Sequence, residues 1–111
     1  NNSEATYAKK IQKIESKINW HENAKKIIAK INAFCPNPGC WFEFSGARIK
    51  IIRAIEIEKK GEAGTFLDSK MTIACAKNAI RILELKKEGK KQMLADEYLK
   101  GNKIKIGQKI S

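Results

Sequence analysis

Residues 41–58, WFEFSGARIKIIRAIEIE, decide the fold class because they have the periodicity of two successive strands separated by a turn. Trp41 to Phe44 is a short aromatic strand candidate, and Ser45-Gly46 after it has the composition of a turn. A long strand is predicted over residues 48–58. Four of its apolar positions share one face, with only Arg53 interrupting: Ile49, Ile51, Ile55 and Ile57.

Further short strands are expected downstream, over residues 65–67, 71–75, 79–85 and 102–110. The strand over 79–85 changes phase after Ile82, which is typical of a β-bulge or of a strongly coiled barrel strand. A short helix is expected over residues 93–100, stopped by Gly101. These elements predict a mainly β chain with edge helices, folded as a small Greek-key barrel that resembles the oligonucleotide-binding fold.

The segments before the first strand have a helical character. Residues 23–34 are the clearest predicted helix, because their apolar residues form a single stripe and Pro36 disfavours helical conformation just beyond it. Residues 1–19 are ambiguous. Their apolar spacing favours a helix, but the same stretch could be an extended linker whose few apolar residues dock on the domain.

Length and charge suggest the class of partner. The chain has 111 residues and a net charge of +11, which favours one domain that binds a polyanion such as nucleic acid. A second interpretation is that an A- and T-rich genome has enriched Lys, Ile and Asn on a solvated surface. No apolar stretch approaches the ~20 residues of a membrane span, and no secretory signal is visible, so a cytoplasmic protein is expected.

Patterns that carry catalysis or bind metals are not found. His21 is the single histidine and has no Ser or Cys partner at a recognised spacing. Glu56 and Glu58 share the face of a strand that we expect to be solvated. Three cysteines lack the paired short spacings of a zinc site and are expected to be free thiols: Cys35, Cys40 and Cys75. We therefore expect no catalytic, cofactor-binding or metal site in this chain.

Clustered lysines are the clearest functional signal. Four surround Gly89 in one predicted loop: Lys86, Lys87, Lys90 and Lys91. The other candidates for contact with nucleic acid are Lys50, Arg53, Lys59 and Lys60, with more lysines over residues 100–109. Loops gather at the rims of a small barrel, so these residues could form a positive face for phosphates, although such a loop can also be only a soluble turn. Trp41 and Phe42 could stack on bases, but their position after a proline turn favours packing in the core.

Several stretches, in order along the chain, resemble the C-terminal domain of methionyl-tRNA formyltransferases. They are residues 5–11 (ATYAKKI), 18–20 (INW), 31–40 (INAFCPNPGC), 64–67 (GTFL), 79–85 (AIRILEL), 89–93 (GKKQM) and 106–110 (IGQKI). This sequence departs from that family's pattern at three positions, where Asn37 replaces a Trp, and Ala63 and Ile106 each replace a Pro. The resemblance covers nearly the whole chain.

The resemblance implies a transferase that moves a formyl group from 10-formyltetrahydrofolate to the methionine carried by initiator tRNA. The folate site and catalytic residues of that family lie in an N-terminal domain. The corresponding division is a linker over residues 1–20, extended rather than helical, followed by a tRNA-binding barrel domain over residues 21–111. A monomer is expected, inactive by itself. Two alternatives stay open: the same barrel in a folate-dependent sugar formyltransferase, and a free-standing oligonucleotide-binding protein.

Overall fold

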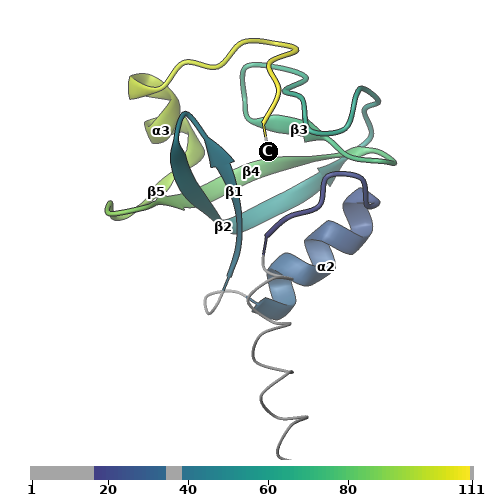
Figure 1. Cartoon of the computed structure of the whole chain (residues 1–111), viewed down its shortest axis with the longest axis horizontal. Helices are drawn as coiled ribbons and strands as arrows, with labels where there is room; N and C mark the ends of the chain where they lie inside the picture. Colours follow the sequence, from purple (N-terminus) through teal and green to yellow (C-terminus); the bar gives the residue numbers. More distant parts are fainter. Residues whose placement is uncertain (1–16, 35–38, 111) are drawn as a thin grey trace, which may run out of the picture.

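The structure, a computed structural model, describes residues 17–34 and 39–110. Its elements are α2 (Ala24–Phe34), β1 (Cys40–Phe44), β2 (Ala47–Ile57), β3 (Thr72–Ala74), β4 (Ala79–Lys87), β5 (Gln92–Leu94) and α3 (Ala95–Gly101). The strands form one antiparallel sheet in the order β1-β2-β4, and β3 and β5 both pair with β4. Figure 1 shows that this sheet is curled, that α2 lies below it, and that α3 lies next to β5 at the upper left of the view. The mainly β architecture with edge helices is confirmed, and the curled sheet is consistent with a small barrel.

The core lies inside the curl of the sheet and is closed by α2. Among its fully buried side chains are Ile27 and Ile31 of α2, which face Ile49 and Ile51 of β2 in one continuous cluster. Burial of each such side chain contributes roughly 1.5–3 kcal/mol to stability, so the stripe that predicts the helix also holds it on the sheet. Phe42 joins this cluster and is fully buried, as the sequence predicts for it.

The β1–β2 hairpin is set by its turn. Ser45 and Gly46 both have positive φ, 53° and 76°, which is the conformation of a two-residue type I′ turn. Because two-residue turns fix the pairing, the register runs from Phe44 opposite Ala47 to Cys40 opposite Ile51. The face of every side chain on β1 and on the first half of β2 follows from this turn.

A change of phase halfway along β2 and β4 alters which residues face the core. The register shifts between Ile51 and Ala54 on β2, and the buried positions of β4 step by three, from Ile82 to Leu85. The irregularity predicted for β4 is therefore confirmed. The sequence did not predict the matching shift on β2, and the prediction that Ile55 shares a face with Ile49 and Ile51 is wrong. Ile55 is turned outward and is 42% exposed.

Three downstream predictions also need correction. The predicted helix at 93–100 begins only at Ala95, because residues 92–94 form β5 and pair with β4. Residues 65–66 make isolated bridges rather than a strand. The strand predicted over 102–110 is not formed, because a turn closed by the Gln108-to-Lys105 hydrogen bond (3.0 Å) interrupts it, and only Lys109 bridges to Thr65.

The start of the described chain belongs to the folded unit. The backbone N–H of Ile18 donates to the carbonyl of Trp41 at 2.9 Å, and Ile18 and Trp20 are buried. The Trp20 ring meets Phe42 edge-on, with 5.7 Å between ring centroids. Residues 1–16, where the linker or helix is predicted, lie outside the described residues. The division into a linker and a domain stays a prediction.

Candidate nucleic-acid interface

A row of side chains crosses the outer face of the sheet at one end. Trp41 of β1 is opposite Lys50 of β2, Lys50 is opposite Lys86 of β4, and Lys86 is opposite Gln92 of β5. The chain neighbours of Lys50 on both sides are completely buried, so the alternation of a strand turns Lys50 to the outer face. The register therefore brings two of the predicted site residues, Lys50 and Lys86, side by side.

The turn between β4 and β5 adds two further predicted lysines to the same end. Its backbone is closed by the N–H of Lys90 donating to the carbonyl of Lys87 at 2.9 Å, and Lys90 and Lys91 are exposed. Glu88 in this turn donates its N–H to the carbonyl of Arg48 at 2.9 Å, which holds the turn beside β2. We call Arg48, Lys50, Lys86, Lys90 and Lys91 the basic face.

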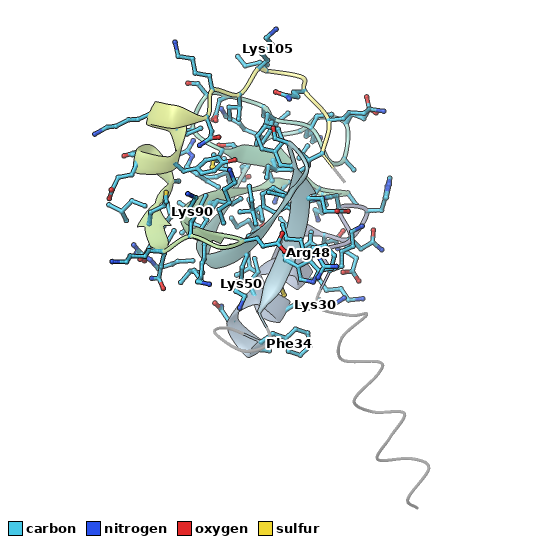
Figure 2. The ribbon with its side chains drawn as sticks, turned by 60° about the vertical axis from the view of Figure 1, so that its left-hand side comes forward. Lys30, Phe34, Arg48, Lys50, Lys90 and Lys105 are labelled. Carbon is cyan, nitrogen blue, oxygen red and sulfur yellow. The ribbon has the colours of Figure 1, made fainter. Side chains whose placement is uncertain are left out.

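Lys50 is held in place by its surroundings. Its aliphatic chain lies over Gly39, so close that a Cβ at Gly39 would stand 2.6 Å from Cδ of Lys50. Gly39 also has a φ of 79°, which favours glycine. In Figure 2, Lys50 lies near Arg48 and above Lys30 and Phe34 at the end of α2, whereas Lys105 is at the top of the molecule. Lys105 therefore belongs to another part of the surface.

Two predicted residues do not join the basic face. Lys87 is opposite the buried Ile49, so it is turned to the other side of the sheet from Lys86. Arg53 is on the outer face, but its Nε donates to Glu84 at 3.0 Å. Hydrogen bonds from Gln92 and Arg53 lower the pKa of Glu84 below its usual value, so this carboxylate is ionised and offsets the charge of Arg53.

The remaining predicted pair, Lys59 and Lys60, follows the far end of β2. The ammonium of Lys59 donates to Asp68 at 3.2 Å, and Asp68 also accepts from Thr72 at 2.8 Å. Burial by itself would raise the pKa of Asp68. Hydrogen bonds from the backbone of Lys70, from Thr72 and from Lys59 outweigh it and lower the pKa from 3.8 to about 2. Lys59 is thus engaged in an ion-pair network and Lys60 is exposed, and the structure does not bring this pair together with the basic face.

Trp41 is not in the core, contrary to the prediction for it. Its neighbours Cys40 and Phe42 are buried, whereas Trp41 stands partly exposed on the outer face. The guanidinium of Arg48 lies 4.2 Å from the ring centroid and the ammonium of Lys17 lies 5.4 Å from it. Sequence reasoning overlooked these three residues as a group. The turn at Ser45-Gly46 was the available signal, because a two-residue turn there pairs Trp41 with Lys50.

The arrangement suits the binding of phosphates better than catalysis. Clustered cations on an outward sheet face can contact a sugar-phosphate backbone. Cys75 is a poor nucleophile, because burial raises the pKa of its thiol to about 12. Within residues 17–34 and 39–110, no group of three or more His, Cys, Asp and Glu side chains could hold a metal ion. The described helices are also too short or too polar to cross a membrane.

Comparisons with known proteins agree with one another. A family model described as formyl transferase, C-terminal domain, matches residues 10–103. A methionyl-tRNA formyltransferase of Bradyrhizobium diazoefficiens is 42% identical over 110 residues, which cover 96% of this chain and 35% of the relative. A methionyl-tRNA formyltransferase of Pelagibacter ubique is 40% identical over 108 residues, again covering 96% of this chain and 35% of the relative. The chain spans about a third of the length of these curated relatives.

A solved structure shares the fold. A variant of HypX from Aquifex aeolicus matches with a TM-score of 0.63 at 19% sequence identity. The match covers 84% of this chain and 20% of the HypX chain. At this identity the likeness concerns the fold alone.

Proposed function

Since this chain belongs to the formyl transferase C-terminal domain family, we propose that it is the tRNA-binding domain of a methionyl-tRNA formyltransferase. In the full enzyme, an N-terminal catalytic domain of the same chain would bind 10-formyltetrahydrofolate and formylate the methionine on initiator tRNA. The present domain would bind that tRNA and orient it toward the catalytic domain. We place the enzyme in the cytoplasm, as a monomer.

The observation that carries this proposal is the pairing of Lys50 with Lys86 on the outer face of the sheet. Like charges directly opposite each other on adjacent strands destabilise a sheet. An anion bound between them would be attracted by both ammonium groups. The sugar-phosphate backbone of tRNA carries one negatively charged phosphate per nucleotide. Lys90 and Lys91 extend the same positive surface along the β4–β5 turn.

The basic face would orient tRNA rather than choose its sequence. Phosphate contacts supply affinity and register but carry little base information. Selection of the initiator species would then rest with the catalytic domain or with a few base contacts. The net charge of +11 adds attraction at long range, which raises the rate of encounter at low salt.

A filter-binding titration of the purified chain with initiator tRNA tests the proposal. We expect binding at about 50 mM salt whose logarithmic dependence on salt has a slope of roughly −3 to −4, as four to five phosphate contacts would give. An elongator tRNA should compete within a few-fold, since phosphates are common to both. Absence of tRNA binding at low salt would overturn the proposal and would favour the barrel of a sugar formyltransferase.

An activity assay tests the assignment of chemistry to another domain. The chain, supplied with charged initiator tRNA and 10-formyltetrahydrofolate, should produce no formyl-methionyl-tRNA. The reason is that His21 is exposed on a turn and Cys75 is buried with a raised pKa, so neither can act as an activated catalytic group. Formylation above the background without protein would show that the chain has catalytic capacity of its own.

A further inference from the structure

The side chain of Trp41 is not part of the buried core, although it is large and aromatic. The inward positions of β1 are already filled by Phe42 and Phe44, which are buried. Trp41 lies between the buried Cys40 and Phe42 and points to the opposite face, where a polar residue would satisfy the alternation of a strand with one solvated side. A large aromatic side chain in that place offers a π surface at the protein boundary.

Cations surround this ring. Arg48 lies over it at 4.2 Å, Lys17 over it at 5.4 Å, and Lys50 is its cross-strand neighbour. Glu43 offsets part of this charge, because it forms a 3.6 Å ion pair with Lys17 and lies opposite Arg48 across the strands. The carboxylate of Glu88 also lies beside Arg48 and accepts its backbone N–H at 3.4 Å. These carboxylates and the contact with the π face compensate part of the repulsion among the cations.

We propose that Trp41 and Arg48 form a stacking platform for one unpaired base of an RNA strand. The base stacks on the exposed guanidinium of Arg48, which the indole of Trp41 supports from beneath. Lys50 and Lys17 lie on either side, where the phosphates that flank the base would pass. The inference rests on the proposed function in taking RNA as the ligand, and adds that this part of the surface binds an unpaired nucleotide.

The chemistry of the platform fits a base better than a phosphate alone. Unpaired RNA bases are recognised by stacking on aromatic rings and on the planar guanidinium of Arg. Such stacking tolerates any base, since every base has a π face, and contributes about tenfold or more in affinity per base. A base held within a duplex is stacked on its neighbours and cannot use the platform. The platform therefore predicts a preference for single-stranded over double-stranded RNA.

Arg48→Lys is the most direct test, because it keeps the positive charge and removes the planar group. The probes are a short oligoadenylate strand and a blunt RNA duplex of the same strand length, titrated over a range of salt. We expect affinity for the single strand to fall about tenfold with an unchanged salt slope, and affinity for the duplex to stay as in the wild type. Arg53→Lys is the matched control, since Arg53 lies on the same strand and face but is engaged by Glu84.

Variants at Trp41 provide a second, independent readout. Trp41→Leu should reproduce the loss for the single strand, and Trp41→Phe should restore most of it because an aromatic face is kept. Melting curves show which variants are folded. If Trp41→Leu does not fold, Arg48→Lys decides alone, because Arg48 is exposed and contributes little to the core.

Three results would overturn the platform. Unchanged single-strand affinity in Arg48→Lys would show that the guanidinium does not stack on a base. An equal loss for both RNAs would assign Arg48 to phosphates, as would a change in the salt slope. These failures differ from failure of the proposed function, in which the wild-type chain would bind neither RNA nor tRNA.

Discussion

The two ends of β2 carry similar numbers of cations but differ in what lies opposite them. At the end near Lys50, lysine faces lysine across the strands. At the other end, Lys59 and Arg81 both contact Asp68, at 3.2 and 3.4 Å. The first arrangement gathers positive charge on the outer face, whereas in the second one carboxylate offsets part of the charge of two cations and supports the fold. A count of basic residues cannot separate these two roles, but the cross-strand register can.

The comparison predicts its largest effect on stability at the Asp68 end. Asp68→Asn should lower the free energy of unfolding by about 2 kcal/mol at pH 7, because the depressed pKa of Asp68 corresponds to that much stabilisation of the ionised form. Urea unfolding measures this change. Binding of tRNA at temperatures where the variant is folded should be unaffected, and a weakened tRNA affinity would contradict the division between the two ends.

The same variant has a pH signature. A lowered pKa means that this stability is fully present above pH 3.8 and is lost as the pH falls towards about 2. Wild-type stability should therefore decline across that window, and Asp68→Asn should decline less. Glu62→Gln is the matched control, since the Glu62 ion pair with Lys109 is exposed and should scarcely matter.

The second effect in size concerns binding at the opposite end. Lys90→Ala combined with Lys91→Ala should weaken tRNA binding about tenfold at low salt and flatten the salt slope by one to two units, if each lysine contacts one phosphate. Lys59→Ala combined with Lys60→Ala removes the same charge from the Asp68 end. Filter binding across salt concentrations compares the two pairs, and equal slopes for both would show that only the total charge matters.

Local sequence patterns were sufficient for much of the fold. The apolar stripe of α2 and the composition of the Ser45-Gly46 turn are read within a few residues, and both are found where expected. Residues 92–94 and 102–110 were misassigned because their conformation depends on partners far along the chain. The short strand β5 forms because it pairs with β4. The last segment is joined to residues 64–66 by individual backbone hydrogen bonds rather than by a continuous strand pairing.

Site prediction had the same limit. A cluster of lysines in a sequence does not show which side of the sheet each side chain faces. Lys86 and Lys87 were therefore grouped, although the strand turns them to opposite sides. Arg53 and Lys59 are offset by carboxylates that lie 31 and 9 residues away in the sequence. Arg48 and Trp41 were not grouped, because their neighbourhood exists only once the hairpin has formed.

The smallest predicted effect distinguishes a surface built for an anion from one that is merely basic. Lys86→Gln removes the like-charge contact with Lys50 while keeping a long polar side chain on β4. We expect the unbound chain to become more stable by a few tenths of a kcal/mol, since facing like charges are destabilising by that order. The melting temperature should rise by about 2 °C at low salt, and the gain should vanish at high salt, where the repulsion is screened. Binding of tRNA should weaken at the same time.

Lys105→Gln, at the other end of the molecule, is the control and should change neither quantity by a comparable amount. A Lys86→Gln variant that loses stability together with affinity would mean that Lys86 supports the fold through contacts of its aliphatic chain. Opposite signs would show that the contact of Lys86 with Lys50 costs stability in the unbound chain while Lys86 contributes to tRNA binding.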